Sequence, residues 1–578
     1  MAPAEICNPP IPIPKTLWHS FEATVANRPE EIAYTVCYQP ADHLSWLVPP
    51  DNAARARHLN WTYSQLKDAT VRIAARFLEQ GVQRGSTLVT FLPNGIEREL
   101  LTWVSVALQL TLMPLDPALF EPGRKAELEH YITSVTPHVV VVRNAEAASE
   151  WDKCSANSEA LKLSLEPISR PEWIGLEALS ANQYDQATAE ALVAQQDLAI
   201  ENDNERIAAI LYTSGTSSGK PKGCAIASRQ FLTVAHSRPI GGGPFKSMAI
   251  YSTNFRSMSN MLAYKNIQTG VRCVLPSPTV NIEKLLDAIE ECAVEAALFM
   301  PYMLYGMASD TKFASGRRDL SSMRFVILGG DVITTDMVAR AKKIFPHAIV
   351  EGAHAMSEAV GCMIMAPPKD GRPATFGNIM CAGTANTAAS IKICDEGRNV
   401  LERGQLGELH LGGPMVIRGY WRNVQPELFY EDEKTHWILT GDRALMDEEG
   451  RVFVVGRSKD IIKKKGMTFS PAVISSTLNR HPGIVATAFG IPHEINGEAT
   501  VAVVENTDPP NSREHIMAIV TDSLGIDYAL DELYTLADVG MDKFPIGATG
   551  KVMNLTLKQA VLKLKERRES AATSNRNC

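Results

Sequence analysis

The sequence predicts an α/β protein with a large N-terminal domain of parallel sheets flanked by helices, followed by a small α+β domain. The chain has 578 residues, of which 45% are hydrophobic. This length corresponds to about two to four domains, and the composition is that of a globular protein with a large core. Alternating helix and strand patterns predict the first domain, and a change of pattern after Gly456 predicts the second.

Helix and strand patterns alternate between residues 60 and 120. Residues 66–77 and 100–108 carry apolar side chains at helical spacing. Between them, residues 88–92 form a short apolar run that ends in a Pro-Asn-Gly turn. This alternation is typical of a parallel sheet covered by helices.

The sheet pattern returns in two later segments. Apolar runs at residues 207–211 and 323–328 predict further strands. Residues 143–203 are polar and irregular, and we expect them to form peripheral elements and a connecting loop.

The segment after Gly456 has the pattern of a separate unit. Its expected elements are strands at 485–491 and 500–504 and helices near 512–525 and 555–566. A compact α+β unit of about 120 residues has the size of an independent domain. We therefore expect one domain over residues 1–457 and a second over residues 458–578.

Composition restricts the partners and the compartment. The net charge is −8 and the pI is about 6.0, whereas a nucleic-acid-binding protein needs a basic face. No apolar run approaches the ~18–20 residues that span a bilayer. The ten cysteines include no C-x-x-C pair, and the chain begins without a charged-then-apolar signal pattern. We expect free thiols in a reducing compartment, the cytoplasm.

A loop rich in glycine and hydroxyl side chains, residues 212–223, follows the strand expected at 207–211. Glycine lets the backbone approach a ligand closely, and hydroxyls and backbone N–H groups can bind phosphate oxygens. Lys222 adds a cation. The loop is not a Walker A motif, because Pro221 follows Lys220 where that motif requires Ser or Thr. Taken alone, such a loop is as consistent with a flexible connection as with phosphate binding. The candidate phosphate-binding residues are Thr213, Ser214, Gly215, Thr216 and Gly219.

Five further motifs follow in order along the chain. They are Leu328-Gly329-Gly330-Asp331, His354-Ala355-Met356-Ser357-Glu358, Thr440-Gly441-Asp442, Gly456-Arg457-Ser458-Lys459-Asp460, and the segment from Phe544 to Lys551. With the glycine-rich loop, this series resembles the adenylate-forming superfamily of acyl-CoA synthetases, peptide-synthetase adenylation domains and luciferases. The loop has one residue more than the superfamily's Y-[TS]-S-G-[TS]-T-G-x-P-K-G signature, between Thr216 and Pro221.

The resemblance implies binding of ATP with Mg²⁺. Gly330 and Asp331 would line the adenine site. Ser357 would hold the α-phosphate, and Glu358 would bind Mg²⁺, a cation that prefers oxygen ligands. His354 stands where the superfamily usually has an aromatic ring on the adenine, and Ala355 replaces a glycine.

The later motifs imply roles for further site residues. The resemblance also implies an N-terminal domain made of several subdomains, followed in the chain by a mobile C-terminal domain. Asp442 would accept hydrogen bonds from both ribose hydroxyls, and Arg457 would contact ribose or phosphate. Lys459 would be the hinge. Lys551 would be the catalytic lysine, because a cation on a long stem can reach the carboxylate and the α-phosphate together. In CoA ligases the segment that here contains Lys463 and Lys465 borders the thiol tunnel.

The acid site is expected around Asn254, Phe255 and Arg256, located by spacing back from Gly270. The histidine of many CoA ligases is absent, and Arg256 lies near the place where amino-acid-activating relatives have an Asp, which disfavours an amino-acid substrate. Asn254 before an aromatic residue is similar to domains that activate hydroxybenzoic acids. The alternative is that Asn254 caps a helix while Arg256 points to solvent. The acid is expected to be aryl or short-to-medium aliphatic.

The acyl acceptor stays open. No carrier domain is recognisable after residue 560, so the expected acceptors are CoA, our first choice, a separate carrier protein, or an amine. Two alternatives to the ligase are a non-catalytic nucleotide-binding relative, suggested by His354 and Ala355, and a phosphate-loop ATPase, disfavoured by Pro221.

Overall fold

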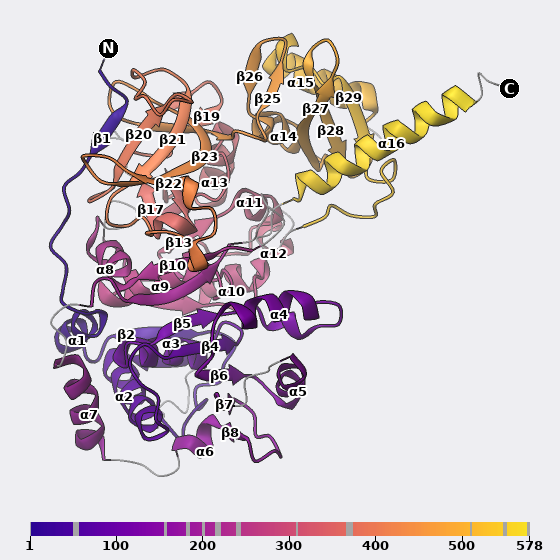
Figure 1. Ribbon diagram of the computed structural model, residues 1–578. Coiled ribbons are helices and arrows are strands. Elements are labelled where there is room, and N and C mark those ends of the chain that lie inside the picture. The colour runs from indigo at the N-terminus through magenta and orange to yellow at the C-terminus, as the bar shows by residue number, and fades with distance from the viewer. Residues whose placement is uncertain are drawn as a thin grey trace.

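The computed structural model describes residues 2–574 except 50–56, 155–158, 181–184, 199–202, 214–220, 239–243, 308–309, 366–373, 509–510 and 547–551. Over these residues the chain forms two seven-stranded sheets, a six-stranded sheet and a five-stranded sheet, together with two short hairpins. Figure 1 shows the two seven-stranded sheets in the lower part of the molecule, with the other two side by side above them.

The first sheet is parallel except for its last pair, β10 and β9, which is antiparallel. Its strands, in spatial order, are β10 (Gly223–Ala227), β9 (Ile207–Tyr212), β5 (Thr111–Pro114), β4 (Thr87–Phe91), β6 (Val139–Val142), β7 (Leu161–Ser164) and β8 (Trp173–Gly175). The four valines of β6 are fully buried, as expected for a strand covered on both faces. The expected peripheral segment therefore adds β7 and β8 to one sheet edge.

The second sheet has the same character. It is parallel except for the antiparallel pair of β2 and β3. Its strands, in spatial order, are β15 (Ile349–Gly352), β14 (Phe325–Leu328), β13 (Ala296–Phe299), β11 (Ser247–Ala249), β12 (Arg272–Leu275), β2 (Ile32–Val36) and β3 (Leu59–Thr62).

Helices cover these two sheets. They are α1 (Leu17–Asn27), α2 (Tyr63–Glu79), α3 (Ile96–Ala107), α4 (Lys125–Ser134), α5 (Ala145–Cys154), α6 (Leu176–Ser180), α7 (Gln186–Leu198), α8 (Ser228–His236), α9 (Ser257–Gln268), α10 (Ile282–Cys292), α11 (Pro301–Met307), α12 (Thr311–Ala314) and α13 (Thr335–Ile344). The helical spacing of residues 66–77 is confirmed in α2, whose apolar positions are buried. A capping box between Thr62 and Gln65 fixes its first turn, which stabilises a helix end by about 1 kcal/mol.

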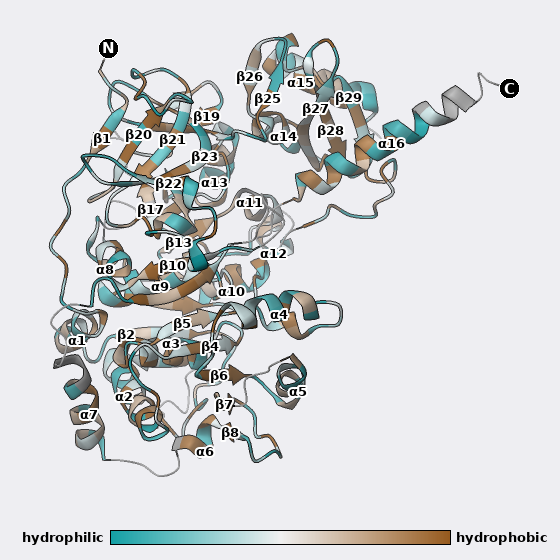
Figure 2. Ribbon diagram, in the orientation of Figure 1, coloured by the Kyte–Doolittle hydropathy of each residue, from teal (hydrophilic) through white to brown (hydrophobic). Residues whose placement is uncertain are grey.

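The third sheet is antiparallel and was not predicted from the sequence. It contains β1 (Glu5–Cys7), β20 (Ser390–Cys394), β21 (Gly407–Gly412), β23 (His436–Met446), β22 (Phe429–Glu431) and β24 (Val452–Arg457). Two hairpins come before β20 in the chain, β16 (His354–Met356) with β17 (Gly361–Ile364), and β18 (Thr375–Phe376) with β19 (Ile379–Met380). Figure 2 shows hydrophobic residues concentrated on the strands of the sheets.

The C-terminal unit contains β25 (Ile462–Lys464), β26 (Met467–Phe469), β27 (Ala486–His493), β28 (Gly497–Val504) and β29 (Glu532–Thr535), with α14 (Pro471–Asn479), α15 (Arg513–Leu524) and α16 (Asn554–Ser574). The predicted fold class, an α/β protein with a small α+β C-terminal domain, is confirmed. α14 packs toward α13 of the larger part, where the Thr334 and Ser476 hydroxyls lie 2.8 Å apart and Arg480 pairs with Asp336 at 2.8 Å.

Candidate active site

The glycine-rich loop joins two antiparallel neighbours, β9 and β10. Where the loop begins and ends, the Thr213 N–H donates to the Lys222 carbonyl over 2.9 Å, so the hairpin brings these two predicted site residues together. Ser214, Gly215, Thr216 and Gly219 lie outside the described residues.

Lys222 is connected to Glu358 through a tyrosine. Its ammonium donates to the Gln425 side-chain oxygen at 2.7 Å and lies 4.6 Å from the centre of the Tyr420 ring. The Tyr420 hydroxyl donates a hydrogen bond to the Glu358 carboxylate. Burial, reinforced by the charge of Glu358, raises the pKa of Tyr420 well above its usual value. Tyr420 and Gln425 were not predicted, and no periodicity in their irregular segment singles them out.

Ser357 and Glu358 follow the β16 strand in a short 3-10 turn (Ser357–Ala359). The Ser357 hydroxyl lies 2.7 Å from that of Ser257, the first residue of α9. Glu358 is only 9% exposed. This turn therefore lies between the Lys222–Tyr420 pair and the start of α9.

Asp442 lies between two of the predicted nucleotide-binding residues. It is 6% exposed, and on the strand pair β23–β24 it is directly opposite Arg457. The Arg457 guanidinium contacts one carboxylate oxygen at 2.9 Å, and the His354 imidazole bonds to the other at 2.8 Å. Arg457 also donates to the Thr440 carbonyl at 2.7 Å. The structure thus unites residues from three of the sequence motifs.

Gly330 and Asp331 lie just beyond the carboxyl end of β14 and are exposed. This is the end of a parallel sheet at which ligands bind in α/β proteins. Gly330 has φ +86, a left-handed conformation that side chains rarely adopt. The Asp331 carboxylate accepts a hydrogen bond from the Val332 N–H at 2.8 Å.

The segment before α9 contains the three predicted acid-binding residues. Asn254 is 4% exposed, and its amide nitrogen donates to the Leu92 carbonyl at 2.9 Å. Arg256 occupies the N-cap position of α9 without a side-chain cap bond. It is partly buried, and its guanidinium lies 5.1 Å from the centre of the Phe255 ring.

Lys459, Lys463 and Lys465 are exposed on the C-terminal side of β24. Lys464 lies between the last two and is 5% exposed, because strand alternation turns it inward to Asp531 at 2.7 Å. Lys551 lies outside the described residues.

Glu358 is the candidate metal ligand. Among the described residues, no three His, Cys, Asp or Glu side chains form a group that could hold a metal ion. A single buried carboxylate fits Mg²⁺ that is bound mainly by nucleotide phosphates, since this ion commonly uses one or two carboxylates together with substrate oxygens.

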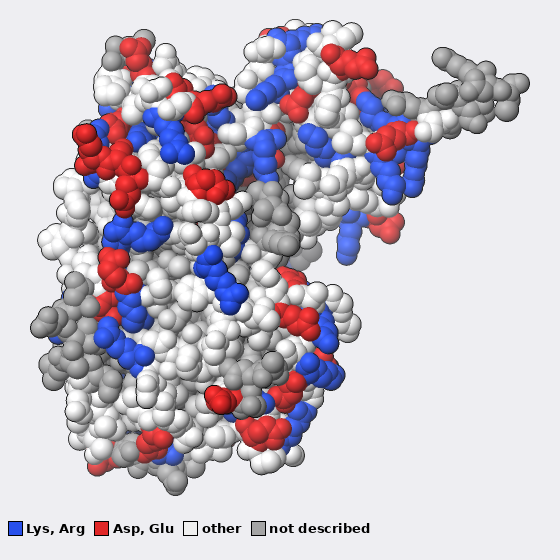
Figure 3. Space-filling model, viewed as in Figure 1, with Lys and Arg blue, Asp and Glu red and all other residues white. Residues whose placement is uncertain are grey.

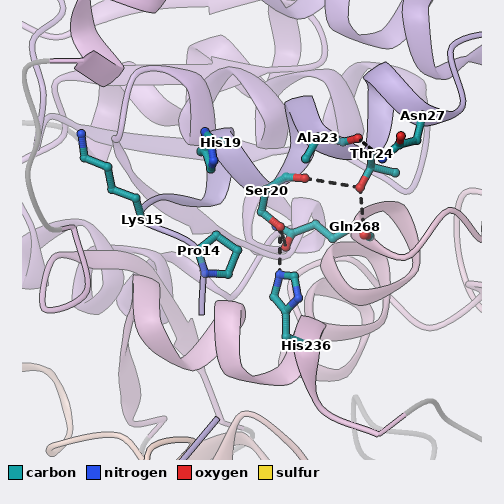
Figure 4. A pocket seen from close by; sticks show the side chains of 9 residues that line it. All are labelled: Pro14, Lys15, His19, Ser20, Ala23, Thr24, Asn27, His236 and Gln268. Atoms are coloured by element: carbon teal, nitrogen blue, oxygen red, sulfur yellow. Dashed lines mark hydrogen bonds between the residues drawn. The ribbon is translucent and has the colours of Figure 1, made fainter. Parts of the chain in front are cut away.

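A cavity of about 330 Å³ lies between α1, α8 and α9. In it the Ser20 hydroxyl bonds to His236 at 3.0 Å and to Gln268 at 2.8 Å (Figure 4). None of its lining residues belongs to the predicted site, so the cavity is separate from the cluster described above.

Acidic and basic side chains are interspersed over the face of the molecule in Figure 3. No helix in the described part of the chain combines the length and the apolar character needed to cross a membrane.

Comparison with known proteins relates this cluster to a family. The model of the family described as AMP-binding enzyme matches residues 21–421. An acyl-CoA ligase of Pestalotiopsis microspora is 29% identical over 97% of this chain and 98% of its own. The 4-coumarate–CoA ligase 1 of Arabidopsis thaliana is 25% identical over 86% and 87% of the two chains.

A solved structure supports the fold. A crystal structure of an anthranilate CoA ligase in complex with anthranoyl-AMP superposes with a TM-score of 0.75 at 17% identity, covering 95% of this chain and 98% of the other. The family model spans most of the chain and includes the glycine-rich loop, Ser357 and Glu358. This protein therefore belongs to the AMP-binding enzyme family.

Proposed function

We propose that this protein activates a carboxylic acid with ATP, forms the acyl-adenylate with release of pyrophosphate, and transfers the acyl group to CoA. The observation that carries the proposal is a connected set of site residues in a member of the AMP-binding enzyme family. Lys222 lies over Tyr420, which donates to Glu358. Asp442 bonds to His354, in the strand that ends just before Ser357. The relatives named as CoA ligases support CoA as the acceptor over a carrier protein or an amine.

The first step joins two anions. An oxygen of the acid attacks the α-phosphorus of ATP, the bond from that phosphorus to the bridging oxygen breaks, and pyrophosphate leaves. The protein must align the reactants and offset their charge. Lys222, Thr213 and Ser357 would bind phosphate oxygens, and Lys551 would offset charge on the reacting groups. Mg²⁺, bound by Glu358, would supply further electrostatic stabilisation of the phosphates.

The second step releases AMP. The thiol of CoA attacks the carbonyl carbon of the adenylate, and the bond from that carbon to the phosphate oxygen breaks. Asp442 and Arg457 would hold the nucleotide through its ribose, and Gly330, Asp331 and His354 would surround its base. Lys463 and Lys465 would lie along the approach of CoA.

Exchange of radiolabelled pyrophosphate into ATP tests the first step. We expect exchange that depends on a carboxylic acid and on Mg²⁺, measured over a panel of aryl, aliphatic and amino acids. Acid-independent ATP hydrolysis would indicate an ATPase, and nucleotide binding without exchange would indicate a non-catalytic relative.

We further propose that residues 1–457 and 458–578 are separate domains that change orientation about Lys459. The Lys459 N–H takes part in none of the hydrogen bonds that hold this turn, where Asp460 and Ile461 both donate to the Arg457 carbonyl.

We also infer a cytoplasmic, reducing compartment, since the cysteines with described side chains are free thiols.

Lys459→Pro tests the hinge. Proline fixes φ near −65°, so we expect the variant to retain one domain orientation and to lose one half-reaction selectively. Pyrophosphate exchange and acyl-CoA formation are measured in parallel, with Lys459→Ala for comparison, because alanine removes the same side chain but leaves φ free to change. A variant with full overall turnover would exclude Lys459 as the hinge.

A further inference from the structure

We propose that Arg256 binds a second carboxylate on the acid, so that the preferred substrate is a dicarboxylic acid activated at one end. This inference rests on the proposed function, because it concerns the acid that the enzyme activates. It follows from the position of Arg256, from the anchoring of its backbone, and from a guanidinium without a hydrogen-bond acceptor among the described residues.

Arg256 lies next to the candidate site. The following residue, Ser257, places its hydroxyl 2.7 Å from that of Ser357. Ser357 is the proposed α-phosphate ligand, and the reacting carboxylate must meet the α-phosphorus in line. The chain segment of Arg256 therefore borders the place where the acid has to lie.

The backbone before Arg256 is firmly held. The Asn254 N–H donates to the Asn94 side chain at 2.9 Å, and its side chain donates to the Leu92 carbonyl at 2.9 Å. Its own carbonyl accepts from the buried Arg98 at 2.9 Å and from Asn260 at 2.7 Å. These bonds occupy the side-chain amide nitrogen of Asn254. They also fix the backbone position from which the Arg256 side chain extends.

The Arg256 guanidinium has no acceptor among the residues that the structure describes. It forms no hydrogen bond or ion pair with any described residue, and its Nε is buried without a partner. Arg98 and Arg318, by contrast, are bound to carboxylates. A buried polar group is normally satisfied, and one without a partner calls for an explanation.

Nearby charges do not replace a partner. Burial lowers the pKa of Arg256, and Asp116 opposes this effect. The Asp116 carboxylate, however, pairs with Arg124 at 3.1 Å, and Arg124 also pairs with Glu127 at 3.0 Å. These carboxylates therefore form no ion pair with Arg256, and its charge is available to bind a ligand. A guanidinium matches a carboxylate through two parallel hydrogen bonds, which favours a carboxylate as that ligand group.

The phosphates of ATP or CoA offer the same anionic chemistry, so the test must separate them from the acid. Pyrophosphate exchange is measured for dicarboxylic acids of increasing length, benzene dicarboxylates included, and for monocarboxylic acids of matched size. We expect a dicarboxylic acid to have the highest kcat/KM in the wild-type chain. Arg256→Leu should lower its kcat/KM relative to the matched monocarboxylic acid by about 10- to 100-fold, the range for one charged hydrogen-bonded partner.

Arg256→Lys should retain part of this preference, because it keeps the charge but not the planar fork. Arg229→Leu is the matched control. Arg229 is also partly buried with an unpartnered Nε, but it pairs with Glu205 at the surface, so its loss should leave the ratio unchanged.

The outcomes distinguish the two proposals. If none of the acids supports pyrophosphate exchange, the proposed function is overturned. Equal kcat/KM for mono- and dicarboxylic acids, unchanged in Arg256→Leu, would overturn only the present inference. An equal rise with every acid in the KM for ATP, measured by exchange, or in the KM for CoA, measured by thioester formation, would assign Arg256 to a phosphate and would also overturn it.

Discussion

Lys551→Ala is expected to lower acyl-adenylate formation by about 10²–10³-fold, the scale for losing one electrostatic donor to a transition state. Transfer from chemically prepared acyl-AMP to CoA should stay close to the wild-type rate. The reason is that two negative groups meet only in the first step. In the second step a thiol attacks carbon, and no further anion approaches the phosphate.

The two half-reactions are measured separately, by pyrophosphate exchange and by thioester formation from acyl-AMP. Lys565→Ala is the matched control, because Lys565 lies on α16 of the same C-terminal unit but pairs with Glu532 on β29. Unaffected adenylation would show that Lys551 has no catalytic role. Equal losses in both steps would indicate a misfolded C-terminal unit, which thermal unfolding would reveal.

The elements that could be predicted from the sequence are those with a local pattern. α2 has helical spacing, and β4, β9 and β14 are short apolar runs between turns. The antiparallel sheet has weaker local signals. Its long strand β23 buries Thr440 and Asp442 among apolar neighbours, and these polar residues are satisfied by partners far away in the chain.

The candidate site was predictable only as far as its motifs extend. The sequence identified Lys222 and Glu358 but not Tyr420, which contacts both. Glu358 precedes Tyr420 by 62 residues, so no spacing rule connects them. Asn254 before an aromatic residue predicted a contact with the acid substrate. In the structure its side-chain amide nitrogen donates instead to the carbonyl of Leu92, 162 residues earlier. Such pairings arise from tertiary packing alone.

The three consecutive lysines of the C-terminal unit also have exposures that the sequence alone did not predict. The sequence run of Lys463, Lys464 and Lys465 carries one kind of charge, but strand alternation separates the middle residue from its neighbours. Lys464 is bound to Asp531 and to the Ala529 carbonyl. Only the pairing of β25 with its neighbours decides which of the three side chains stay exposed.

Asp442→Ala is expected to weaken ATP binding by roughly 10²-fold or more, because each ribose hydroxyl would lose an acceptor and one such loss costs about 1–3 kcal/mol. The carboxylate already lies between His354 and Arg457, so the substitution also removes what holds these two side chains in place. Asp442→Asn keeps one oxygen acceptor and should have an intermediate effect. Titration calorimetry with ATP gives the affinity directly.

Asp447→Ala provides the control for the β23–β24 hairpin. Asp447 follows β23 and binds Arg451 at 2.6 Å, so its replacement removes a paired carboxylate from the same hairpin without touching the Asp442 cluster. If the two variants weaken ATP binding equally, the hairpin as a whole is responsible. If Asp442→Ala binds ATP as the wild type does, Asp442 does not bind the ribose. Selective loss in Asp442→Ala with an unchanged melting temperature would assign the effect to the nucleotide contact, because a general loss of structure would lower both.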